Sequence, residues 1–126
     1  AASCFGIRQV WFTGNRVSLK GDRGYRLPGE ERMKGYADVE IIQNDRPFDQ
    51  FPSWAEPVCV EFRKGTQPMH SFIHPVNAVY VFGPEDGSVG PDFTRLCHHF
   101  VSIPTAHCLN LSVAVAITLY DRSMKL

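Results

Sequence analysis

Two short segments combine residue types that could hold a ligand and take part in chemistry. Residues 82–88 read F-G-P-E-D-G-S and follow an apolar run. Gly83 would let a ligand approach the backbone closely, and Pro84 would fix the turn. In the second segment, Asn110 and Ser112 precede an apolar stretch, where their side-chain oxygens could cap the start of a helix. On residue type alone, both ligand binding and ordinary turn and cap roles remain open.

A group of cysteines and histidines near the C-terminus raises the alternative of a metal site. Its members are Cys97, His98, His99, His107 and Cys108. Adjacent His-His and His-Cys pairs lack the spacing usual for zinc ligands, so we expect no metal. His98 and His99 are interpreted as surface residues just past a helix end, where the helix dipole favours them. His70 and His74 have no partner recognisable from the sequence.

Five runs rich in apolar, β-branched and aromatic residues predict the strands that would position these segments. They are residues 9–13, 39–42, 58–62, 78–82 and 100–103. Near-continuous apolar strands separated by helices or long connections indicate an α/β fold with a parallel sheet covered on both faces. In such sheets ligands bind outside the carboxyl ends of the strands, which here means the loops after Phe62, Phe82 and Ile103.

The helices are expected between these strands and at the two ends of the chain. A helix is predicted to end at Gly6, which suits the left-handed position after a last turn. Further short helices are expected around residues 30–34, within 45–54 and over 91–97. The last helix, residues 110–123, is apolar nearly all round and should be buried on most faces. Ala114 and Ala116 leave room there for close packing against another helix.

Composition fits one ordinary globular domain of 126 residues, with 44% hydrophobic and 21% charged residues. No apolar run reaches the roughly 18 to 20 residues that a membrane helix needs, and no basic leader marks a signal peptide. The four cysteines form no C-x-x-C pair, so we interpret them as free thiols of a cytoplasmic protein. Because the chain opens on what reads as the end of a helix, we expect an upstream strand and most of that helix to be missing.

Charge is distributed unevenly, although the formal net charge is zero. Between Gly14 and Gly35 six basic residues stand against three acids; they are Arg16, Lys20, Arg23, Arg26, Arg32 and Lys34. From Tyr36 to Glu61 the balance reverses, with one arginine against six acids. The basic connection is either an ordinary solvated loop or a surface that contacts phosphates.

Taken together, the two segments resemble the motifs of a known enzyme family. V-F-G-P-E-x-G-S, an I-P further on and L-N-L-S-V-A-V-A-I-x-L-Y-D are similar to the SpoU/TrmH branch of the SPOUT RNA methyltransferases. A-S-C-F-G-I resembles the family's first motif after its arginine, and E-F-R-K-G resembles the turn beside the cofactor. The resemblance covers the whole chain.

The resemblance implies a particular fold and cofactor site. It implies an α/β, SPOUT-type, mostly parallel sheet with helices on both faces and a C-terminal trefoil knot, although true knots are otherwise nearly absent from proteins. It also implies that S-adenosylmethionine binds in the knot, held mainly by backbone groups. Carried onto this sequence, the cofactor-binding residues are Glu61, Phe62, Phe82, Gly83, Ile103, Cys108 and Leu109.

The chemistry implied is methyl transfer to a ribose 2′-hydroxyl of tRNA or rRNA, with S-adenosylhomocysteine as the product. Asn110 and Glu85 match the family's polar site residues, with Ser112 as a supporting cap. Homodimers, an RNA partner and no metal or membrane are also implied. Two other interpretations stay open: a non-catalytic SPOUT-like module that binds cofactor or RNA, and a nucleotide-binding α/β domain of another kind.

Overall fold

The computed structural model describes residues 5–13, 39–61, 65–84, 89–107 and 109–126. It divides into two compact units, Ala1–Phe51 and Pro52–Leu126. The predicted helix at residues 30–34 and the basic connection lie outside the described residues. Among the described residues, no helix is long and apolar enough to span a membrane.

The first unit contains a pair of parallel strands, β1 (Gln9–Phe12) and β2 (Glu40–Gln43), paired from Gln9 opposite Glu40 onward. Both were predicted within a residue, because β-branched and aromatic residues favour extended backbone. A short 3-10 helix, η5 (Pro47–Gln50), follows within the segment expected to hold one. Gly6 has φ +76°, which confirms the left-handed conformation predicted for it.

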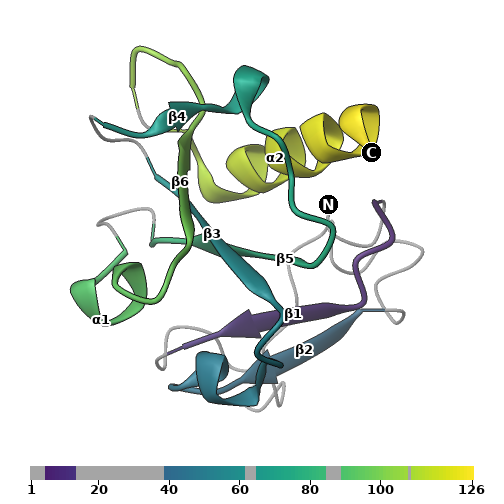
Figure 1. The fold of residues 1–126 in the computed structure, drawn as a ribbon, viewed down its shortest axis with the longest axis vertical. Coiled ribbons are helices and arrows are strands. Elements are labelled where there is room, and N and C mark those ends of the chain that lie inside the picture. Colours follow the sequence, from purple (N-terminus) through teal and green to yellow (C-terminus); the bar gives the residue numbers. More distant parts are fainter. Residues whose placement is uncertain (1–4, 14–38, 62–64, 85–88, 108) are drawn as a thin grey trace, which may run out of the picture. The chain divides into compact units, whose positions relative to one another are not determined.

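The second unit contains a four-stranded sheet in which every pairing is parallel, as the apolar strand pattern predicted (Figure 1). Its strands are β3 (Glu56–Val60), β4 (Gln67–Pro68), β5 (Ala78–Phe82) and β6 (His99–Ser102), in the order β4-β6-β3-β5. Strand β3 lies between β5 and β6 and is the most buried of the four. β4 was not predicted.

The helices among the described residues of this unit are the 3-10 helix η6 (Met69–Ser71), α1 (Pro91–Thr94) and α2 (Leu111–Lys125). Helix α1 ends three residues before the predicted boundary, and α2 continues two residues beyond it. Figure 1 shows α2 in yellow alongside the segment between β4 and β5, to which Lys125 is bound by hydrogen bonds. This contact joins the last helix to a segment about fifty residues earlier in the sequence.

The core of the second unit forms around β3. Buried side chains of Val58, Val60, Met69, Phe72 and Val101 pack together, with Phe82 and Ile103 partly buried against them. Cys59 is also fully buried, and Cys97 is half-buried; neither is part of a disulfide bond, as expected for reduced cysteines. The last residue of β5 and the residue after β6 therefore pack against this apolar core.

The expectation that the last helix is buried on most faces was wrong for the chain as described. Only Thr118 and Leu119 of α2 are buried. Val113, Ile117, Tyr120 and Met124 are 45%, 36%, 58% and 68% exposed. Their spacing of three and four residues places them on one side of the helix, so the apolar residues opposite the core form an exposed stripe.

Candidate functional site

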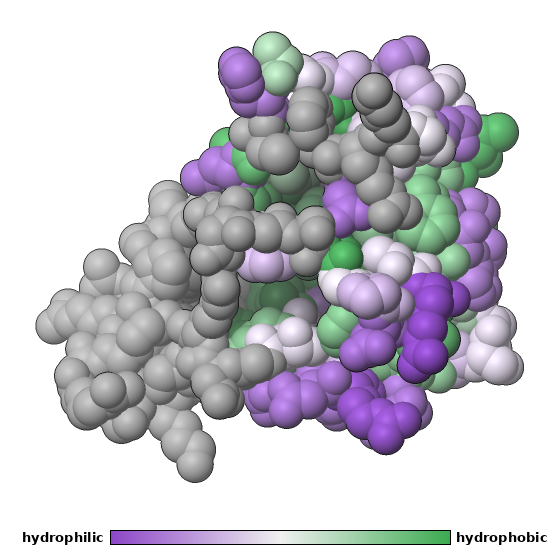
Figure 2. All heavy atoms as spheres, turned by 90° about the vertical axis from the view of Figure 1, so that its left-hand side faces the viewer, coloured by the Kyte–Doolittle hydropathy of each residue, from purple (hydrophilic) through white to green (hydrophobic). Residues whose placement is uncertain are grey.

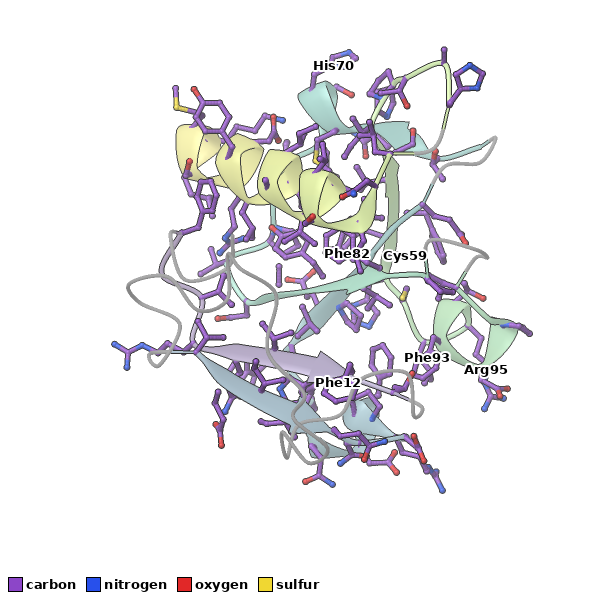
Figure 3. All side chains as sticks on the ribbon, turned by 180° about the vertical axis from the view of Figure 1, so that it is seen from behind. Phe12, Cys59, His70, Phe82, Phe93 and Arg95 are labelled. Atoms are coloured by element: carbon purple, nitrogen blue, oxygen red, sulfur yellow. The ribbon has the colours of Figure 1, made fainter. Side chains whose placement is uncertain are left out.

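The carboxyl ends of three neighbouring strands meet at one edge of the second sheet. Val60 lies opposite both Phe82 of β5 and Val101 of β6. Glu61, Gly83 and Ile103 follow at or near these ends, so the structure brings together the described parts of the three loops that were predicted to meet. Figure 3 labels Cys59 and Phe82 on the adjacent strands, Phe93 on α1 and Arg95 directly after this helix.

Glu61 connects this edge through its side chain as well as its backbone. Its backbone N–H donates to the carbonyl of Val101 over 2.9 Å. Its carboxylate oxygen Oε1 accepts a hydrogen bond of 2.9 Å from the backbone N–H of Val89, beyond the loop that follows β5. The sequence predicted only a backbone role for Glu61. The carboxylate therefore links the end of β3 to Val89, which follows the loop after β5.

The segment between β6 and α2 is held by its own hydrogen bonds. The Thr105 hydroxyl donates to the carbonyl of His107 over 2.6 Å, while the His107 residue is exposed. Leu109 is half-buried. Phe62, Glu85 and Cys108, which were predicted as site residues, lie outside the described residues.

Asn110 is the N-cap of α2, as predicted. Its backbone is extended, with φ −61° and ψ 146°, and its side-chain Oδ1 accepts a hydrogen bond of 3.2 Å from the Val113 N–H. The Ser112 hydroxyl donates to the same oxygen over 2.9 Å. The predicted supporting role of Ser112 is thus a direct bond to the Asn110 amide.

A second polar cluster holds the other end of α2 and was missed from the sequence. The His74 side chain is fully buried, with Nδ1 2.7 Å from the Tyr80 hydroxyl and Nε2 2.7 Å from Asp121 Oδ2. Arg122 donates to the Tyr80 oxygen over 3.0 Å, and Lys125 contacts Asp121 Oδ2 at 2.8 Å. No partner of His74 was recognisable from the sequence, because Tyr80 lies in β5 and Asp121 in α2.

The charges of this cluster shift two titration equilibria. Burial raises the pKa of Tyr80 above its usual 10.0, and the hydrogen bond and charge of Arg122 only partly oppose this. For Asp121, burial acts to raise the pKa, but the hydrogen bonds and charges of Lys125 and His74 outweigh it and lower the pKa below 3.8. The cluster therefore favours a neutral phenol beside an ionised carboxylate.

Of the two adjacent histidines predicted to lie at the surface, only His98 is exposed. His98 is exposed, but His99 lies in β6, with Nε2 3.2 Å from Glu56 Oε1. Across the described part of the chain, no three histidine, cysteine, aspartate or glutamate side chains are grouped so that they could hold a metal ion. Figure 2 views the left-hand side of Figure 1, toward which β5 runs, and hydrophobic residues lie there among hydrophilic ones.

Comparison with known proteins identifies the family. A sequence model described as the SpoU rRNA Methylase family matches residues 1–120. The chain belongs to this family. The resemblance stated from the sequence motifs is therefore confirmed over nearly the whole chain. No match was found among the curated proteins.

Solved structures of SpoU and TrmH proteins share the fold. The TrmH/SpoU tRNA modifying enzyme of A. aeolicus is 18% identical with a TM-score of 0.77, over 98% of this chain and 64% of its own. The methyltransferase AviRb from Streptomyces viridochromogenes, in complex with the cofactor AdoMet, is 15% identical with a TM-score of 0.79, over 98% and 51%. An AdoMet-bound rRNA methyltransferase from Sinorhizobium meliloti is 17% identical with a TM-score of 0.79, over 99% and 49%. The chain spans between about half and two thirds of these proteins.

Proposed function

We propose that this protein is an S-adenosylmethionine-dependent RNA methyltransferase that modifies a ribose 2′-hydroxyl in tRNA or rRNA. The observation that carries the proposal is the meeting of the ends of β3, β5 and β6 in a chain whose family match covers residues 1–120. Ligands of open parallel sheets bind at this edge. The two AdoMet-bound relatives with the same fold support the choice of ligand.

The described residues at this edge suit such a cofactor. Phe82, Ile103 and Leu109 are half-buried apolar residues, which suits contact with an adenine ring, and Gly83 has no side chain to cover its backbone. The residues proposed to hold the cofactor are Glu61, Phe62, Phe82, Gly83, Ile103, Cys108 and Leu109. The Glu61–Val89 hydrogen bond would fix two of the contributing segments relative to each other. When bound, S-adenosylmethionine supplies a methyl group made electrophilic by its sulfonium.

The protein's own residues have to orient the RNA and remove one proton. The ribose oxygen forms its new bond to the methyl carbon, and the hydroxyl proton leaves to an acceptor. Alignment of the hydroxyl with the methyl group supplies much of the rate. We assign Asn110 to this orientation, and Glu85 to holding the loop and partner groups in place.

The remaining features of the proposal rest on family membership and on the exposed residues of α2. We propose that residues 1–126 form one SPOUT domain and that α2 completes a trefoil knot around the cofactor. A homodimer is proposed because the stripe of Val113, Ile117, Tyr120 and Met124 is exposed in the single chain. RNA is the proposed partner, and the cytoplasm is the proposed location.

Methyl incorporation tests the proposal directly. The protein would be incubated with methyl-labelled S-adenosylmethionine and bulk tRNA or rRNA, and the labelled nucleotide identified after digestion. A 2′-O-methylated nucleoside is the expected product, whereas a base-methylated nucleoside would contradict the ribose assignment. Binding of S-adenosylhomocysteine without any methyl transfer would favour the non-catalytic module instead.

A further inference from the structure

The hydrogen bonds of Asn110 determine which end of its amide can meet a ligand. Oδ1 accepts from two donors, the Val113 N–H at 3.2 Å and the Ser112 hydroxyl at 2.9 Å. An amide oxygen has two lone pairs, so these two bonds occupy its accepting capacity. A backbone N–H can only donate, so the contact with Val113 also rules out the flipped amide, which would place two donors together.

The opposite end of the same amide is available. Asn110 is exposed, and its Nδ2 has no hydrogen-bond partner among the residues that the structure describes. This nitrogen carries two N–H donors and no lone pair that can accept. Asn110 follows directly on the segment that leaves the carboxyl end of β6, within the proposed site.

We infer that Asn110 acts in the proposed methyl transfer as a hydrogen-bond donor to a ligand oxygen and does not accept the proton of the ribose hydroxyl. We further infer that Ser112 is a positioning residue, because its hydroxyl holds the amide oxygen turned toward the helix. The inference rests on the proposed function and assigns the chemistry of one of its residues. The ligand oxygen belongs either to the cofactor or to RNA, since both carry anionic and hydroxyl oxygens.

The replacement of Asn110 by aspartate separates the donor role from the cap role. Aspartate caps helices as well as asparagine does, so Asn110→Asp should melt at about the same temperature as the wild-type protein. It has no N–H to donate, and its charge would oppose an anionic oxygen. We expect methyl transfer to fall by about tenfold or more, as for the loss of one hydrogen bond to a charged oxygen.

The control is Asn77→Asp, which makes the same chemical change at the exposed residue before β5, at the opposite edge of the sheet. It should leave transfer and binding unchanged. Ser112→Ala should lower transfer less than Asn110→Asp, and Ser112→Thr, which keeps the hydroxyl, should restore it. Affinity for S-adenosylhomocysteine, measured by calorimetry, and the KM for bulk tRNA and rRNA would show which ligand carries the oxygen.

A readout independent of turnover comes from the side-chain amide signals in a nitrogen–proton NMR spectrum. The Asn110 pair, identified by its loss in Asn110→Asp, should shift on addition of S-adenosylhomocysteine or bulk tRNA, while the Asn77 pair should not. Wild-type transfer by Asn110→Asp, or unmoved Asn110 signals in a protein that binds both ligands, would overturn the donor role alone. A wild-type protein that neither binds S-adenosylhomocysteine nor transfers methyl groups would overturn the proposed function and this inference with it.

Discussion

The ionisation of Asp121 is coupled to the fold. It accepts from His74 and Lys125 at 2.7 and 2.8 Å, and its pKa is lowered by these contacts despite burial. A carboxyl with a lowered pKa contributes stability that is complete above its unfolded pKa, near 3.8, and is lost as the pH falls through the folded value. Acid should therefore release α2 from the cluster.

The first prediction is that Asp121→Asn weakens the pH dependence of stability in this acid range. At neutral pH the variant should lose about 1–3 kcal/mol, because His74 and Lys125 lose a charged acceptor. Urea unfolding between pH 3 and pH 7 measures both effects. The control Asp49→Asn removes an exposed carboxylate paired with Arg46, and should cost little. An unchanged acid profile in Asp121→Asn would show that other carboxyl groups control it.

Gly83 is the residue on which the proposed cofactor site depends most directly. The second prediction is that Gly83→Val abolishes the rise in melting temperature caused by S-adenosylhomocysteine, because the new side chain fills the approach to the backbone. Gly90→Val is the matched control, since a Cβ at Gly90 meets no atom within 4 Å. Full ligand stabilisation of Gly83→Val would remove this backbone from the site.

At the scale of elements, local patterns predicted most strands but not the contacts between distant segments. β5 was predicted to the residue, because Ala78–Phe82 is a continuous apolar run between turn residues. β4 was missed because it consists of Gln67 and Pro68, and only pairing with β6 makes it a strand. His74 was missed for the same reason, since Asp121 lies 47 residues away.

Some features of the candidate site could be predicted from the sequence, and others could not. The cap formed by Asn110 follows from a local rule, and the structure confirms it. The side-chain bond from Val89 to Glu61 could not be predicted, because it depends on how close the loops after β3 and β5 return to each other. The predicted length of α2 was nearly right, but its predicted burial was wrong. When apolar residues occur on all sides of a helix, the sequence does not show which side faces the core.

The third prediction concerns the exposed stripe of α2. Tyr120→Glu places a charge among Val113, Ile117 and Met124, and should convert the proposed dimer to a monomer, because charged groups are excluded from interface centres. Sedimentation velocity at micromolar concentration measures the change. Gln50→Glu adds the same charge at an exposed residue of η5 and should remain dimeric. A wild-type protein that sediments as a monomer would rule out the dimer itself.

At the scale of the whole molecule, the fourth prediction concerns RNA affinity. If the basic connection contacts phosphates, Arg23→Ala combined with Arg26→Ala should weaken RNA binding and flatten its salt dependence by about one unit of slope per lost contact. Binding of S-adenosylhomocysteine should not change. Arg46→Ala combined with Arg95→Ala removes two exposed arginines elsewhere and serves as the control. An unaltered salt slope in the first variant would identify the connection as a solvated loop.

The parallel pairing of every described strand has a kinetic consequence. The smallest separation between paired residues is the 22 positions from Glu56 to Ala78, and Val58 pairs with His99 from 41 positions away. No hairpin among these strands can form early and serve as a template, so each pairing requires closure of a long loop before any contact energy is gained. Chains with such high contact order fold in milliseconds to seconds, where helical bundles need microseconds. Until β6 arrives, β3 has an unpaired edge, and its apolar residues are then accessible to other nascent chains.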